Sequence, residues 1–139
     1  MTDQLSLLPM LDDAEHPTWL LNGKHGVQND SGVYVDNVFR FRESKLSGVN
    51  VEVELCAEGD RVLFEFSYFT GTYGCGHPLC RPCHECHRNN SAEFLAEMIF
   101  STFKTVVQSD RNMTNYTKET KELLKLCKRA CDRIAKEIK

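Results

Sequence analysis

The sequence has no long apolar run: none approaches the roughly 18 residues that a helix needs to cross a bilayer. Its N-terminus lacks a basic stretch followed by an apolar one, so we expect no secretion signal. Without export, the seven cysteines would stay reduced, and we expect a cytoplasmic protein with no membrane partner. The strong basic surplus of a dedicated nucleic-acid binder is also missing, because the formal net charge is -3. What remains, at 139 residues and 41% hydrophobic content, is a chain suited to one domain with a modest core.

Cysteine and histidine are concentrated in residues 75–87, which read Cys-Gly-His-Pro-Leu-Cys-Arg-Pro-Cys-His-Glu-Cys-His. This segment has too little apolar material to offset the entropy of its own ordering, so a bound metal ion is the simplest way to hold it. Tetrahedral zinc takes Cys sulfur and His nitrogen, often in pairs two to four residues apart. The predicted ligands are Cys75, Cys80, Cys83 and Cys86, with His77, His84 and His87 as substitutes. A disulfide knot or a cluster of free thiols are the alternatives, and the former needs an oxidising compartment.

Two known metal-site patterns overlap the first part of this segment. Residues 75–83 resemble the centre of a RING finger, Cys-x-His-x2-Cys-x2-Cys, but the further Cys-x2-Cys pairs that a RING requires are missing. The spacing of Cys75, Cys80 and Cys83 also matches that of plant-type [2Fe–2S] ferredoxins. An iron–sulfur cluster is therefore the alternative cofactor, although the neighbouring histidines favour zinc.

Fragments of two enzyme patterns occur in the second part. Residues 79–84 resemble the zinc-binding tail of HNH endonucleases, yet no histidine between His25 and His77 is present to act as general base. Residues 82–86 contain the Pro-Cys-x2-Cys of zinc deaminases without the His-x-Glu that precedes it. We therefore predict a closed, structural zinc site and no enzymatic activity, with a metal-dependent nuclease as the less favoured alternative.

Hydrophobic periodicity predicts the elements around this loop. Apolar and polar residues alternate in three segments, residues 33–42, 49–55 and 62–68, as in strands with one buried face. Two helices follow: one is predicted from the capping-box spacing of Asn90 to Glu93 as far as about Gln108, and one from about Thr117 to Ile138. The predicted fold is α+β: a small antiparallel three-stranded sheet, a Cys/His-rich metal loop and two C-terminal helices. Together they form one domain, residues 33–139.

A row of lysines lies opposite the apolar side of the last predicted helix. Its members are Lys118, Lys121, Lys125 and Lys128, followed by Lys136. Lysines at this spacing can follow a nucleic-acid backbone, but few aromatic residues accompany them, so base stacking has little support. A solvated helix face is the simpler interpretation.

Residues 1–32 have the composition of a flexible acidic tail, with five acidic residues and one lysine. Near its start, the tail resembles the short peptide by which bacterial proteins dock on the replicative sliding clamp, usually Gln-Leu-Ser/Asp-Leu-Phe. The residues concerned are Gln4, Leu5, Ser6, Leu7 and Leu8, the last standing where Phe is preferred. The resemblance implies that the leucines fill an apolar cleft while the glutamine bonds at its rim. Alternatively, these residues pack on their own domain.

Taken together, these patterns predict a non-enzymatic, zinc-stabilised binding module with a protein partner. The clamp-like peptide and the lysine row favour an accessory or regulatory role in bacterial or phage DNA replication or repair. The competing hypothesis is a protein–protein inhibitor or adaptor, of phage or plasmid origin, that acts on a host enzyme or defence system.

Overall fold

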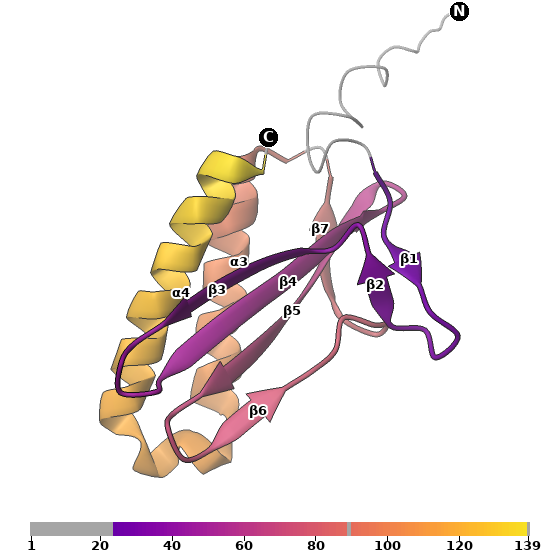
Figure 1. The fold of residues 1–139 in the computed structure, drawn as a ribbon. Coiled ribbons are helices and arrows are strands. Elements are labelled where there is room, and N and C mark those ends of the chain that lie inside the picture. Colours follow the sequence, from indigo (N-terminus) through magenta and orange to yellow (C-terminus); the bar gives the residue numbers. More distant parts are fainter. Residues whose placement is uncertain (1–23, 89, 139) are drawn as a thin grey trace, which may run out of the picture.

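The computed structural model describes residues 24–88 and 90–138. A twisted antiparallel sheet is covered on one face by two helices that lie side by side, and a small second sheet lies near one end of it (Figure 1). In chain order, the elements are β1 (Val27–Gln28), β2 (Tyr34–Asp36), β3 (Phe39–Ser44), β4 (Asn50–Glu58), β5 (Arg61–Phe69), β6 (Gly74–Gly76), β7 (His84–His87), α3 (Ala92–Ser109), the 3-10 helix η2 (Arg111–Asn115) and α4 (Thr117–Glu137).

The prediction of a three-stranded sheet is wrong, because the main sheet has five strands and a separate sheet has two. The main sheet runs β3-β4-β5-β6, and β7 also pairs with β5. Of the two added strands, β6 overlaps the start of the predicted metal loop, residues 75–87, and β7 forms its end; there Cys, His and Gly hide the alternation typical of a strand.

The second sheet arises because the predicted strand over residues 33–42 is broken. Asn37 has a φ of +56°, a left-handed conformation that interrupts extended backbone. The chain before it forms β2, which pairs with β1, whereas the chain after it forms β3 and joins the main sheet. β1 lies within residues 1–32, the predicted tail, and pairs with β2, which lies in the predicted domain. The division of the chain into tail and domain stays a prediction.

Both α3 and α4 pack their apolar sides on one face of the main sheet. The most deeply buried residues include Val53, Leu55, Phe64 and Phe66 from the sheet, Leu95, Ile99 and Phe103 from α3, and Leu123, Leu126 and Ile134 from α4. This burial supplies the main hydrophobic stabilisation of the domain. α3 begins one residue later than predicted, because the N-cap is Ser91, whose hydroxyl accepts a hydrogen bond from the Phe94 backbone N–H at 3.0 Å.

A smaller cluster covers part of the opposite face of the sheet. Tyr34, Cys56, Leu63 and Leu79 are buried in it, and Val38 and Cys83 pack against its side. The chain before β1 comes so close here that a Cβ built on Gly26 would lie 2.7 Å from the Cys56 Sγ. Only glycine allows this approach, which anchors the start of the described chain to the sheet.

Of the helices within residues 24–88 and 90–138, none is long and apolar enough to cross a membrane.

Candidate functional site

The Cys/His segment begins and ends on the same neighbouring strand. β6 pairs with the last part of β5, with Cys75 opposite Tyr68, and β7 pairs with its first part, with His84 opposite Phe64. The chain between the two strands, residues 77–83, leaves the sheet edge and returns to it (Figure 1). The main sheet thus fixes both ends of the predicted metal loop.

Two of the predicted ligands lie together at the start of this loop. The Cys75 Sγ is 3.6 Å from the His77 Nε2. Residues two apart in an extended chain project on the same side, and the hydrogen bond of the His77 N–H to the Phe66 carbonyl continues the strand pairing up to that position. Cys75 is half-buried, whereas His77 is exposed.

The other predicted cysteines do not join this pair. Cys86 is 5% exposed and belongs to the main core, where burial raises the pKa of its thiol to about 11. Cys83 packs against the smaller cluster beside Cys56, and burial raises the pKa of the Cys83 thiol as well. Cys80 is half-buried in the loop. The side chains of Cys83 and Cys86 therefore lie in different clusters.

The two remaining histidines, His84 and His87, each lie near a carboxylate. The Nε2 of His84 is 3.5 Å from the Glu65 carboxylate, and the His84 ring stacks on Phe64 with centroids 5.5 Å apart. His87, which is exposed, has its Nε2 3.9 Å from the Asp60 carboxylate. Across residues 24–88 and 90–138, no three donors of the kind that bind metals are grouped closely enough to hold an ion.

A second polar cluster lies where α3 ends, and the sequence patterns did not identify it. The Asp110 Oδ2 accepts hydrogen bonds from the hydroxyls of Tyr68, at 2.5 Å, and Tyr73, at 2.9 Å. The Asn112 backbone N–H donates to the Oδ1 at 2.9 Å. Partial burial would raise the pKa of Asp110, but these hydrogen bonds outweigh it and lower the pKa. The sequence carries one signal for this cluster: Asp110 stands two residues before Asn112 at the start of a polar connection, a position where an Asp side chain often accepts a backbone hydrogen bond.

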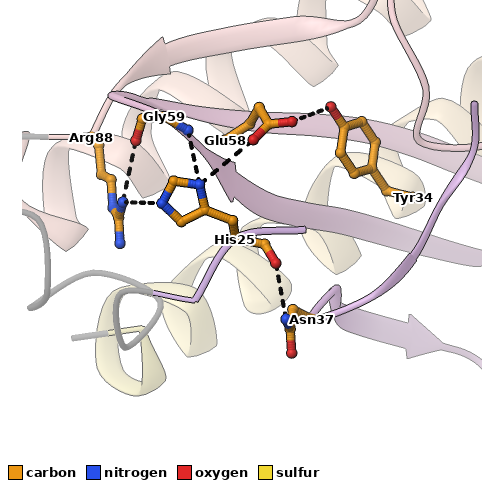
Figure 2. A network of polar contacts seen from close by, with 6 residues as sticks. All are labelled: His25, Tyr34, Asn37, Glu58, Gly59 and Arg88. Carbon is orange, nitrogen blue, oxygen red and sulfur yellow. Dashed lines mark hydrogen bonds and ion pairs between the residues drawn. The ribbon is translucent and has the colours of Figure 1, made fainter. Parts of the chain in front are cut away.

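A third cluster joins the smaller sheet to the turn between β4 and β5 (Figure 2). The His25 Nδ1 accepts from the Gly59 backbone N–H at 3.3 Å, and the Arg88 Nη1 lies 3.5 Å from the His25 Nε2. Glu58 accepts a hydrogen bond from the Tyr34 hydroxyl at 3.0 Å. These contacts connect the strands to one another, so we assign the cluster a structural role.

The lysine row lies on the surface. Lys118, Lys121, Lys125 and Lys128 are exposed on α4, and the Lys128 Nζ pairs with Asp132 at 2.9 Å. The row forms a solvated helix face, and nucleic-acid binding by it stays a prediction. The clamp-like residues Gln4, Leu5, Leu7 and Leu8 lie outside the described residues.

Comparison with known proteins finds no family model, curated protein or solved structure that matches this chain.

Proposed function

We propose that this chain is a non-enzymatic binding module in which one structural zinc ion closes the loop between β6 and β7. The observation that supports this most directly is the pairing of Cys75 and His77. With Zn–S of about 2.3 Å, Zn–N of about 2.0–2.1 Å and tetrahedral angles, two such ligands would be about 3.6 Å apart. The Cys75 Sγ and His77 Nε2 lie at 3.6 Å, the spacing of two corners of that tetrahedron.

The proposed ligand set is Cys75, His77, Cys80 and Cys83. The last two are the other thiols of the same loop, and both are only half-buried. Cys86 is excluded from this set because its side chain is buried in the main core, whereas Cys75 packs against that core and is half-buried. Cys83 packs against the smaller cluster, so the loop would have to bring Cys83 to Cys75 and His77 when zinc binds. Leu79 anchors this loop in the smaller cluster, and a bound zinc would add stabilisation to the rest of residues 77–83, since metal binding and folding are coupled.

The metal assignment is tested by elemental analysis and the visible spectrum of the purified full-length protein. We expect about one zinc per chain and no colour. Cys75→Ser, His77→Ala and Cys80→Ser should each remove the zinc and lower the melting temperature, whereas His87→Ala should leave both unchanged. Iron with a brown colour would replace this proposal with an iron–sulfur protein.

One further variant separates a ligand from a core residue. Cys86→Ser places a hydroxyl in the main core, so it should lower the melting temperature while the zinc content stays the same. Loss of zinc in this variant, with retention in His77→Ala, would restore the four-cysteine set in place of the one proposed.

The proposed partner is a bacterial sliding clamp or a related protein of DNA replication and repair, bound through residues 4–8. This part rests on the resemblance of the sequence alone. A fluorescently labelled peptide of residues 1–12 should bind a purified clamp with micromolar affinity, and replacing Leu7 and Leu8 by alanine should abolish binding. Absence of binding at roughly 100 μM peptide would contradict the partner without affecting the zinc proposal.

A further inference from the structure

A continuous groove runs along the outer side of the helix pair. It consists of three adjoining hollows between α3 and α4, of about 430, 350 and 370 Å³. The first and second share Leu124, and the second and third share Phe100 and Lys128. Since the lining residues of α4 extend from Thr117 to Ala135, the groove is about 27 Å long.

The groove has an apolar floor and, over two of its hollows, a basic rim. Val107, Leu124 and Phe100 form much of the floor in this part, and the last two are only partly buried. Lys121, Lys125 and Lys128 line the same two hollows, with Asp110 at the first, whereas the third hollow is lined by Glu93, Glu97 and Asp132. Lys128 is paired with Asp132, so Lys121 and Lys125 are the cations that an acidic occupant would meet. Such a surface favours an occupant that combines apolar side chains with negative charge.

We propose that this groove binds residues 4–15 of the chain itself. Five apolar side chains of this segment would contact Phe100 and Leu124: Leu5, Leu7, Leu8, Met10 and Leu11. The acidic residues that follow them, Asp12, Asp13 and Glu15, would lie against Lys121 and Lys125. The chain before Lys24 has four acidic residues and no lysine or arginine, so its charge complements the rim.

The length of the intervening chain also favours this occupant. The chain between Glu15 and Lys24 can extend over about 30 Å, whereas a folded chain of 139 residues has a radius of gyration of about 14 Å, so the segment can reach the groove. Binding would cover residues 4–8 and compete with any partner for them. No lining residue of the groove belongs to residues 75–87, and the inference does not depend on the zinc proposal.

Photo-crosslinking in the full-length protein tests this inference. With p-benzoylphenylalanine in place of Leu8, irradiation should give a monomeric product joined to peptides that contain Phe100 or Leu124, as identified by mass spectrometry. Lys121→Glu combined with Lys125→Glu should reduce the yield several-fold. The control pair, Lys104→Glu with Lys136→Glu, changes exposed lysines that do not line the groove and should leave the yield unchanged.

Reversing the charges of the bound segment keeps the test valid even if the variant with Lys121→Glu and Lys125→Glu folds poorly. Asp12→Lys with Asp13→Lys should also reduce the crosslinking yield. Combining these two changes with Lys121→Glu and Lys125→Glu should restore it. Crosslinks to other parts of the chain, equal yields in all variants, no restoration, or a product of twice the mass would each overturn the inference.

Discussion

At the scale of single residues, Asp110 connects the sheet to the helical layer. Its carboxylate accepts the hydroxyls of Tyr68 on β5 and Tyr73 before β6, while its backbone ends α3. Burial raises the pKa of the Tyr68 hydroxyl, which therefore stays a hydrogen-bond donor at all physiological pH values. Both tyrosines thus depend on a charged acceptor at position 110.

Replacing Asp110 by Asn should destabilise the fold. The amide keeps one acceptor oxygen in place of two, and hydrogen bonds to a charged group are worth about 1.5–3 kcal/mol each. We expect a loss of about 1–3 kcal/mol at pH 7, measured by urea denaturation, and no significant change for the exposed control Asp30→Asn.

The lowered pKa of Asp110 also predicts that the stability of the fold depends on pH. Because the pKa of Asp110 is lower in the folded state than its ordinary value of 3.8, its contribution to stability is complete above that value. The contribution is lost as the pH falls through the lower pKa of the folded state. Between pH 5 and pH 2, wild-type stability should therefore decrease more steeply than that of Asp110→Asn. Parallel curves would show that the carboxylate has no such role.

At the scale of elements, α4 is attached to the edge strand β3 by Arg133. Its Nη1 donates to the Arg42 carbonyl at 3.2 Å and to the Glu43 carboxylate at 3.0 Å, and its guanidinium lies 5.2 Å from the centroid of the Phe41 ring. The Arg42 carbonyl of this edge strand is therefore hydrogen-bonded to the helix. Edge strands whose backbone groups stay unpaired can pair with other chains.

Arg133→Ala should cost about 1 kcal/mol, because a partly exposed ion pair and a cation–π contact are lost together. Arg133→Lys should recover only part of this, since an ammonium lacks the planar guanidinium that lies over the Phe41 ring. Arg129→Ala, which removes a more distant pair at 3.8 Å from Glu43, is the matched control and should cost less. Equal effects in urea denaturation would contradict the role of Arg133.

The helices and strands also show which features of the fold the sequence patterns could predict. The helical period placed α4 within one residue of its ends, because its apolar residues recur over 21 positions. In β6 and β7, only three and four residues long, the residue types that indicate metal binding conceal the pairing. The tertiary contacts of Asp110 could not be predicted, since Tyr68 is 42 residues away in the chain. The spacing did not single out the Cys75–His77 pair, since His77 was predicted only as a substitute ligand. The burial of Cys86 could not be predicted either, because it depends on where β7 lies.

At the scale of the whole molecule, the main core and the proposed metal loop are separate sources of stability. The core residues come from β3 to β7, α3, η2 and α4, and most lie outside residues 75–87. Chelation of zinc should therefore leave the far-UV circular dichroism close to that of the untreated protein. Hydrogen exchange should increase at residues 77–83 and stay slow in β4 and α4. Complete unfolding on chelation would mean that the loop, and not the core, holds the domain together.

The pairing of β6 and β7 with one strand has a consequence for how this architecture could vary. The partners of Gly76 and His84 on β5, Ser67 and Phe64, are three residues apart, while Gly76 and His84 themselves are eight apart. The two short strands are thus one edge strand with five surplus residues, and the loop between them is an insertion into a four-stranded sheet. A relative without the insertion would keep the fold and lose Cys80, so metal binding can be gained or lost here without any change in topology.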